Sequence, residues 1–392
     1  MTTQWPTQKL GDLCDLVGGG TPAKDRKDFY GGTIPWATVR DMNVEILTST
    51  EHSLTEAGLE ASSSHVVPAG SVVIATRVGL GKVVILAQDT AINQDLRGLV
   101  IRNHNTVTDR FLYWWYRSAT RKVISAGTGA TVQGVTLPFV SSLEVPVPPL
   151  AEQKRIVAKL EALLPEIEHG LSLIAQTQAK SDDVVLSCLA ETFQRQGASP
   201  SKSYGEVAEL SLGKMLDRKK ATGRHPTPYL RNVNVRWGVF DTSDVMEMDI
   251  TPSELDRVSV RRGDVVVCEG GEPGRCAVWR EERSMAIQKA LHRMRPKPDM
   301  DSDYLALNLE YQIKCGTAKE LFTGTTIKHL TGEKLQVMTL PVPPLNEQQE
   351  AVAHMKAVRD GADALRSVAD ARRRTLIAMR QSVLAAAFRG DL

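Results

Sequence analysis

The chain has 392 residues and a mass of 43.0 kDa, so we expect two or more domains, each large enough for its own core. Hydrophobic residues make up 42%, charged residues 24%, and the net charge is +2, which is ordinary for a soluble globular protein. No apolar run approaches the ~18 residues of a membrane span, and residues 1–10 lack a signal-peptide core, so we expect a cytoplasmic location. The five scattered cysteines, without a Cys-x-x-Cys pair, argue against a disulfide framework or zinc site.

Two long stretches, residues 1–147 and 198–342, contain short β-branched runs separated by glycine and proline. This pattern predicts two mixed α/β segments, each with a curved sheet. A helical pattern in each segment leads into a loop rich in threonine and glycine. The predicted strands are residues 71–75, 82–86 and 264–267, and the predicted helices are residues 111–124 and 302–320.

A proline-rich hinge ends each α/β segment, and a long helical pattern follows it. Residues 148–197 and 343–392 each predict a helix of about 40 residues, or roughly 60 Å. Pro165 and Gly170 predict a kink or local break in the first helix. Apolar residues recur at spacings of three and four, typical of a coiled-coil seam, so we expect the two helices to pack antiparallel. The predicted seam is Leu160, Leu164, Ile167, Leu171 and Ile174 in the first helix, and Leu365, Ala369, Leu376, Met379 and Val383 in the second, with Arg372 an imperfect member.

An internal repeat connects the two halves of the chain. Residues 145–150 (VPVPPL) recur as residues 340–345 (LPVPPL), a shift of 340 − 145 = 195, and a Glu-Gln pair follows each copy. Five further matches follow in order at shifts of 193 to 195. The chain is therefore predicted to be a tandem duplication with pseudo-two-fold symmetry, suited to a two-part target. The Glu-Gln pairs are Glu152-Gln153 and Glu347-Gln348. The five further matches are residues 10–13 with 204–207, Gly70 with Gly263, 91–94 with 286–289, 129–132 with 324–327, and 187–193 with 382–388.

The charges are unevenly distributed despite the small net charge. Residues 211–236 hold seven basic side chains and one acidic one, and a shorter basic turn, residues 24–27, lies at the corresponding place in the first half. Such loops suit the neutralisation of phosphate groups, although a solvated loop would have the same composition.

Signatures of catalysis are missing from the sequence. Adenine-type amino-methyltransferases need an Asn/Asp-Pro-Pro-aromatic loop, whereas both Pro-Pro pairs here read Val-Pro-Pro-Leu. The phosphate-binding pattern Gly-x4-Gly-Lys-Ser/Thr is also missing, and the eight histidines show no metal-binding spacing. Residues 18–22 (GGGTP) are expected to form a loop. We therefore expect a chain without catalytic activity of its own.

The combination of these motifs resembles the specificity subunits of type I restriction–modification systems. The resemblance rests on the Pro-x-Pro-Pro-Leu-x-Glu-Gln hinge, the long helix after it, and the closing residues 382–392 (SVLAAAFRGDL). The opening Trp5-Pro6-x-x-x-Leu10-Gly11-Asp12 and residues 263–275 (GDVVVCEGGEPGR) extend it over essentially the whole chain. It implies an α+β fold with two α/β target-recognition domains, residues 1–147 and 198–342, joined by two conserved helices, residues 148–197 and 343–392, which pair as a spacer.

The resemblance also implies a function and partners. Each recognition domain would read one half of a split double-stranded DNA sequence, and two methyltransferase subunits that use S-adenosylmethionine would bind the chain. Two motor–nuclease subunits using ATP and Mg²⁺ would complete the complex, while this chain would bind no cofactor or metal. Adding a helical turn would change the spacer by about one or two base pairs. An orphan specificity subunit, or a protein-binding scaffold without catalytic activity, is the alternative.

Residue types and their positions suggest which side chains would contact DNA. Arg and Lys suit guanine, Asn and Gln suit adenine, and Lys, Arg and hydroxyl groups suit phosphate. Arg77, Gln133, Arg275 and Lys328 are the strongest candidates, because each lies in a polar stretch that recurs between the halves. The full predicted set is Lys24, Arg26, Lys27, Arg40, Thr76, Arg77 and Gln133 in the first domain, and Lys214, Arg218, Lys219, Lys220, Arg231, Asn232, Arg275, Lys328 and His329 in the second.

Two further groups of residues are assigned from the sequence. Trp36, Trp114 and Trp115 are expected in the core rather than against DNA bases. Arg155 and Lys159, opposite the predicted seam, are expected to be available to a methyltransferase subunit.

Overall fold

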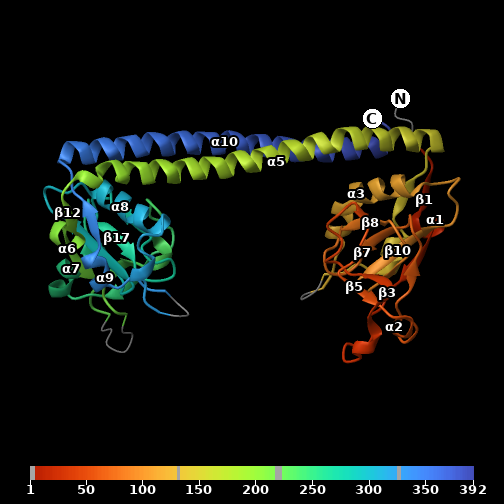
Figure 1. Ribbon diagram of the computed structural model, residues 1–392, viewed down its shortest axis with the longest axis horizontal. Helices are drawn as coiled ribbons and strands as arrows, with labels where there is room; N and C mark the ends of the chain where they lie inside the picture. The colour runs from red at the N-terminus through yellow and green to blue at the C-terminus, as the bar shows by residue number, and fades with distance from the viewer. Residues whose placement is uncertain (1–4, 130–132, 217–222, 325–327) are drawn as a thin grey trace. The chain divides into compact units, whose positions relative to one another are not determined.

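The computed structural model describes residues 5–129, 133–216, 223–324 and 328–392 (Figure 1). The chain divides into two compact units, Met1–Ile174 with Ala371–Leu392, and Ala175–Asp370. Each unit contains one α/β domain and part of each of two long helices, α5 (Leu150–Arg195) and α10 (Leu345–Arg389). We call the two parts the first unit and the second unit.

The α/β domain of the first unit contains two main sheets and one long helix. Its elements, in chain order, are β1 (Thr7–Lys9), α1 (Leu10–Leu13), β2 (Cys14–Gly18), η1 (Lys27–Phe29), β3 (Tyr30–Ala37), β4 (Ile46–Leu47), β5 (His52–Leu54), α2 (Glu56–Glu60), β6 (Val66–Val67), β7 (Val72–Ala75), β8 (Val83–Leu86), β9 (Thr90–Ile92), β10 (Leu96–Ile101), α3 (Asp109–Ser125), α4 (Leu137–Ser141) and β11 (Glu144–Pro146). One sheet has the order β2-β10-β7-β8-β4, the other β5-β3-β9-β6, and β1 pairs with β11.

The α/β domain of the second unit repeats this arrangement. Its elements are η2 (Gln196–Ala198), β12 (Ser201–Ser203), α6 (Tyr204–Val207), β13 (Ala208–Leu212), β14 (Pro226–Leu230), η3 (Asn232–Asn234), β15 (Met246–Asp249), α7 (Pro252–Val258), β16 (Ser259–Val260), β17 (Val265–Cys268), β18 (Cys276–Val278), β19 (Met285–Ile287), β20 (Leu291–Pro296), α8 (Ser302–Lys314), η4 (Lys319–Leu321), α9 (Gly332–Val337) and β21 (Thr339–Pro341). The sheets have the orders β13-β20-β17-β18 and β15-β14-β19-β16, and β12 pairs with β21.

These elements confirm the three predicted strands and both predicted helices, with one boundary corrected. Helix α8 ends at Lys314 rather than at residue 320, because Gly316 adopts a left-handed conformation with φ +79°. The matching element order in the two units agrees with a tandem duplication.

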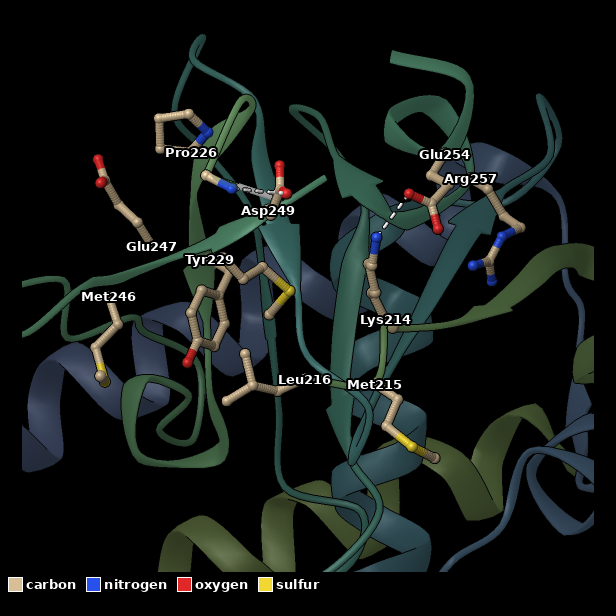
Figure 2. Close-up of a pocket in the computed structure, with 13 residues that line it drawn as sticks. Lys214, Met215, Leu216, Pro226, Tyr229, Met246, Glu247, Asp249, Glu254 and Arg257 are labelled. Carbon is tan, nitrogen blue, oxygen red and sulfur yellow. Dashed lines mark hydrogen bonds and ion pairs between the residues drawn. The ribbon is translucent and has the colours of Figure 1, made fainter. Parts of the chain in front are cut away.

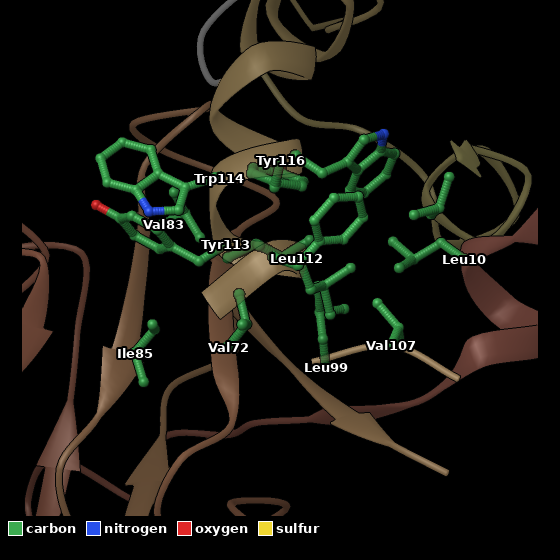
Figure 3. Packing of buried hydrophobic residues seen from close by; sticks show 14 of the residues in the cluster. Leu10, Val72, Val83, Ile85, Leu99, Val107, Leu112, Tyr113, Trp114 and Tyr116 are labelled. Atoms are coloured by element: carbon green, nitrogen blue, oxygen red, sulfur yellow. The ribbon is translucent and has the colours of Figure 1, made fainter. Parts of the chain in front are cut away.

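Helix α3 lies between the five-stranded sheet and the long helices of the first unit. Aromatic side chains from residues 111–116 fill this space, and they pack on Val72, Ile85 and Leu99 of the sheet (Figure 3). Trp114 and Trp115 are buried here, and Trp36 is buried elsewhere in the domain, as expected. The opposite side chains of β7 enter a second cluster, so this strand is buried on both faces.

Helix α5 runs as one element through Pro165, so of the predicted kink or local break the break is wrong and the kink stays a prediction. Leu164 and Ile167, on either side of the proline, are buried in the same core cluster as α3. Their packing offsets the backbone hydrogen bond that proline cannot make, which costs about 3 kcal/mol in a helix interior.

The long helices run antiparallel to one another within each unit, as the repeat predicts. In the first unit, Arg380 donates to the Glu168 carboxylate at 2.9 Å. In the second unit, Gln178 donates to Asp370 at 3.0 Å, and Arg366 forms an ion pair with Asp182. The residue numbers on α10 therefore fall as those on α5 rise.

The seam prediction is correct for α5 near the first domain and only partly correct for α10. Leu160, Leu164 and Ile167 are buried, and Leu171 and Ile174 are half-buried. On α10, Ala369 is buried, Leu376 and Val383 are half-buried, and Arg372 is exposed.

Leu365 and Met379 were assigned to the seam incorrectly, since they are 43% and 48% exposed. The buried face of α10 instead carries small residues such as Ala362, Ala369 and Ala387. Met355 and Leu384 are buried on α10 as well, so small and large apolar residues share the buried surface of this helix. Gly170 of α5 lies close to Leu376 of α10, since a Cβ added to Gly170 would lie 3.0 Å from Cδ1 of Leu376.

Among the described residues, no helix combines the length and the apolar character that a bilayer crossing requires.

Two adjacent leucines test the packing of α5. Leu164→Ala should lower the free energy of unfolding by about 2–5 kcal/mol, because Leu164 is 4% exposed within the core cluster. Leu163→Ala is the matched control and should cost about 0.5 kcal/mol, since Leu163 is 39% exposed. Urea denaturation measures both, and equal losses would show that α5 does not bury this face.

Candidate nucleic-acid interface

In the first unit, several predicted DNA-contacting residues gather where β7 ends and β10 begins. The backbone N–H groups of Thr76 and Arg77 donate to the Asp95 carbonyl oxygen, at 2.8 and 3.3 Å. The Thr76 hydroxyl donates to the same oxygen at 3.2 Å and is buried, so Thr76 joins the strand ends and is withdrawn from the surface. The Arg77 side chain stays 56% exposed, with Nε 3.9 Å from the Asp95 carboxylate.

A second segment brings Gln133 to the same place. Thr128 and Gly134 exchange backbone hydrogen bonds at 3.0 and 2.9 Å, and the Val135 N–H donates to the Thr76 carbonyl at 2.9 Å. A Cβ added to Gly134 would lie 3.2 Å from Cγ of Arg77. Gln133 is exposed beside it. We call Thr76, Arg77, Asp95, Gln133 and Gly134 the first loop cluster.

The second unit builds the same arrangement from different side chains. Glu269 N–H donates to the Ala290 carbonyl at 2.9 Å, Leu330 N–H donates to the Glu269 carbonyl at 2.8 Å, and Thr323 and His329 exchange bonds at 2.9 and 2.8 Å. Lys328 is exposed, and half-buried His329 packs so closely that a Cβ on Gly270 would lie 3.0 Å from its Nδ1. The second loop cluster is Glu269, Gly270, Ala290, Lys328 and His329.

The sequence predicts that Arg275 contacts DNA, but its side chain is held within the domain. Its side chain is 14% exposed; Nη2 donates to the Asn232 carbonyl at 2.9 Å, and Nη1 to the Glu272 carboxylate at 3.0 Å. Nδ2 of Asn232 donates to the Gly270 carbonyl at 3.1 Å. Arg275 and Asn232 therefore hold the backbone beside the second loop cluster, because Arg275 bonds the Asn232 carbonyl and Asn232 bonds the Gly270 carbonyl.

Two other predicted basic contacts are also held in ion pairs. Arg231 donates to the Asp244 carboxylate at 2.6 Å, and Lys214 to the Glu254 carboxylate at 2.6 Å, with both basic side chains 22% exposed. The ammonium of Lys214 lowers the pKa of Glu254 to about 2. Arg218, Lys219 and Lys220 lie outside the described residues.

The remaining basic candidates of the first domain lie on its surface. Lys24, Lys27 and Arg40 are exposed, and the Arg40 side chain keeps 80% of its area accessible. Arg26 is exposed but donates to Asp28 at 2.9 and 2.7 Å, and its guanidinium lies over the Phe29 ring at 4.3 Å.

The Lys214–Glu254 pair forms part of the wall of a cavity of about 790 Å³ in the second unit (Figure 2). Met215, Leu216 and Tyr229 supply apolar surface, and no histidine, serine or cysteine occurs among its described lining residues.

Sequence reasoning missed the role of a buried glutamine at the start of α5. Gln153 is fully buried, and its Nε2 donates to the carbonyl oxygens of Thr106 at 2.8 Å and Pro148 at 2.9 Å. Its Oε1 accepts from the Thr108 N–H at 3.0 Å. Thr108 is the N-cap of α3, so one side chain ties the hinge, α5 and the start of α3 together.

Gln348 makes the same contacts in the second unit. It is fully buried, its Nε2 donates to the carbonyls of Asp299 at 3.0 Å and Pro343 at 2.9 Å, and its Oε1 accepts from the Asp301 N–H at 2.9 Å. Asp301 is the N-cap of α8. We call the two sets of contacts the glutamine clasps. The Glu-Gln pair repeated after each hinge is the sequence signal that marks these two glutamines.

Ion pairs add a second attachment between each domain and its long helix. Arg110 on α3 donates to Glu161 on α5 at 2.7 Å. Arg359 on α10 donates to Glu310 on α8 at 2.6 Å, and Lys314 bonds the same carboxylate at 2.6 Å.

Comparison with known proteins agrees with this architecture. Residues 3–174 and 201–367 each match the family described as "Type I restriction modification DNA specificity domain". The chain belongs to the type I restriction–modification specificity family. The two matched regions correspond to the two repeats.

Two curated relatives have modest sequence identity to this chain. The specificity subunit of EcoR124I/EcoR124II from Escherichia coli is 31% identical over 43% of this chain and 43% of its own length. The MjaIX specificity subunit of Methanocaldococcus jannaschii is 30% identical over 40% of this chain and 37% of its own length. The chain thus spans less than half of the length of these relatives.

Two solved structures share the fold over the whole chain. A chain from work on complex assembly and conformational transition of the type I R-M system has a TM-score of 0.81 at 23% identity, covering 100% of this chain and 99% of that one. The HsdS subunit from Thermoanaerobacter tengcongensis has a TM-score of 0.62 at 23% identity, covering 100% and 98%.

The residues expected to meet a methyltransferase lie at the start of α5 in this specificity subunit. Arg155 donates to Glu152 at 2.7 and 2.6 Å and to the Leu392 carbonyl at 2.7 Å. Lys159 is exposed. Arg155 therefore joins the start of α5 to the C-terminal residue, and Lys159 remains accessible.

A buried histidine lies beneath the second loop cluster. His292 is 4% exposed, with Nε2 3.5 Å from the Glu269 carboxylate. Burial lowers the pKa of His292 below its ordinary value of 6.5, and Glu269 and a hydrogen bond with the Leu330 backbone offset part of this effect.

The lowered pKa of His292 predicts a loss of stability in acid. His292 binds its proton more tightly in the unfolded chain than in the folded one. The contribution of neutral His292 to the free energy of unfolding is therefore present above pH 6.5 and is lost as pH falls through the pKa of the folded state. Unfolding free energies at about pH 7 and about pH 5.5 should differ less in His292→Gln than in the unchanged protein. His354→Gln, at an exposed histidine of α10, is the control and should retain the full difference. An unchanged difference in His292→Gln would contradict this assignment.

Proposed function

We propose that this chain reads a bipartite, asymmetric double-stranded DNA sequence, one half-site for each α/β domain, and has no catalytic activity of its own. The observation that carries the proposal is the pair of loop clusters, which share one backbone arrangement but differ in side chains. Arg77 and Asp95 of the first cluster correspond to Gly270 and Ala290 of the second. Two loop clusters with the same backbone arrangement but different side chains suit two different half-sites.

The accessible side chains of the clusters have the chemistry that base recognition requires. Arg77 and Lys328 can donate to guanine, and Gln133 can form paired hydrogen bonds with adenine. The exposed Lys24, Lys27 and Arg40 suit phosphate contacts. Arg275, Asn232 and Thr76 contribute by shaping the loops rather than by touching bases.

The long helices suit a spacer that also holds protein partners. Apolar side chains remain accessible on them, including Leu173 at 47%, Val184 at 55% and Val368 at 52% exposed. We assign these faces to two methyltransferase subunits that use S-adenosylmethionine, in a complex completed by two motor–nuclease subunits that use ATP and Mg²⁺.

Methylome sequencing tests the proposal directly. Cells that express this chain with its neighbouring methyltransferase should carry methyl-adenine in a split motif that is absent from cells lacking the chain. If the methyltransferase is active and no motif depends on this chain, the chain is an orphan subunit or a protein-binding scaffold.

Two exposed arginines at opposite ends of β10 test the first loop cluster. Arg77→Ala should weaken binding of the assembled complex to its target by about 1–3 kcal/mol, the value of a paired contact to a base. Arg102→Ala is the matched control, since Arg102 is similarly exposed (51% against 56%) but follows the other end of the strand. Titration of labelled DNA measures both variants. Equal affinities for the two variants would remove Arg77 from the interface.

A further inference from the structure

We propose that Gln153 and Gln348 are positioning residues that determine how strictly the distance between the two half-sites is read. This inference rests on the proposed function, because it assigns to the clasps the angle at which each recognition domain meets its helix. Neither side chain is placed to touch DNA, since both are fully buried.

In each clasp, both N–H groups and the oxygen of the glutamine side-chain amide form hydrogen bonds, and these bonds join the long helix to the hinge and to the α/β domain. The Gln153 amide donates both hydrogens, to the segment before α3 and to the hinge, and its oxygen accepts from the N-cap of α3. Gln348 does the same for the segment before α8, the second hinge and the N-cap of α8. The helix, the hinge and the domain are thus fixed to one another.

The six contacts that the two clasps share are all made to backbone atoms, and in the first unit the Thr108 hydroxyl adds a longer contact of 3.5 Å to Gln153 Oε1. The carbonyls of Thr106, Pro148, Asp299 and Pro343 accept, and the N–H groups of Thr108 and Asp301 donate. The side chains at the corresponding domain positions differ between the units, yet the contacts are the same. The attachment therefore does not depend on the recognition-domain sequence, which can change while the domain keeps its angle to the helix.

In the first unit the rest of the attachment between domain and helix is less directional, whereas in the second unit Arg359 also donates to the Glu310 carboxylate, which is 9% exposed. In the first unit, α5 buries Ile156, Leu160 and Leu164 against α3, and apolar burial favours contact without selecting one orientation. Hydrogen bonds weaken steeply when their angles change. The Arg110–Glu161 pair is partly exposed, with side chains 35% and 38% accessible, so it constrains the angle weakly. The buried clasp is the part best able to hold one angle.

Glutamine alone has the reach and the groups for this contact. Glutamate would place an oxygen against two carbonyl oxygens, and asparagine is shorter by one methylene. Methionine matches glutamine in length but removes the partner of two carbonyls and one N–H in each clasp, and the hinge carbonyls of Pro148 and Pro343 lie in buried contacts. Gln153→Met and Gln348→Met therefore remove the directional contacts while keeping an apolar side chain of similar size.

Spacer selectivity is the measurement that separates this role from a purely structural one. The full chain, assembled with its methyltransferase, is titrated with DNA carrying both half-sites at the native spacing or one base pair longer or shorter. In Gln153→Met and Gln348→Met, the preference for the native spacing should fall about tenfold, with each half-site sequence unchanged. Gln349→Met changes the exposed neighbour of Gln348 and should keep the full preference.

The outcomes are distinct. Relaxed spacing in both clasp variants, with normal spacing in Gln349→Met, supports the positioning role. An even loss of affinity across all spacings, or no change, overturns it. If a methionine variant fails to fold, Gln153→Asn and Gln348→Asn provide the same comparison, with thermal melting as the folding control. Failure of the unchanged protein to recognise any split site would instead refute the proposed function before the variants are compared.

Discussion

A single buried amide at the start of each long helix joins that helix to the α/β domain of its own unit. Gln153 and Gln348 each meet two carbonyls and one N–H, so three backbone groups gain a partner in each unit, including the buried hinge carbonyl of Pro148 or Pro343. An unsatisfied buried polar group costs about 1–3 kcal/mol, which makes the contact both a stabilising and an orienting feature. The position of each loop cluster relative to its helix follows from this attachment.

The two units show how one backbone arrangement supports two different surfaces. In each, a strand end, the start of a neighbouring strand and a returning segment are held by backbone hydrogen bonds, which are independent of side-chain identity. The side chains on this frame are therefore free to differ, as Gln133 and Lys328 do at equivalent places. This separation of frame from surface suits the two different half-sites proposed for the two domains.

Charge in this protein has two uses that the net charge of +2 does not distinguish. Arg275, Arg231 and Lys214 are held by carbonyl or carboxylate oxygens and stabilise loops of the second domain. Lys24, Lys27 and Arg40 remain accessible on the first domain. Burial of a guanidinium requires partners, and Arg231 and Arg275, which the loops enclose, each have an oxygen partner.

The amino-acid sequence by itself determined the duplication, the two long helices, the main strands and the buried tryptophans, because a repeat is read by comparing residue types along the chain and apolar spacing is a property of neighbouring residues. The tertiary structure decided which polar groups acquire partners: Gln153 meets Thr106 and Arg275 meets Asn232 across more than 40 residues. It also decided that Ala362 and Ala369 are buried on α10 while Leu365 is exposed. The physical reason is that hydrogen-bond satisfaction and close helix contact depend on which distant segments meet, and local spacing does not encode that meeting.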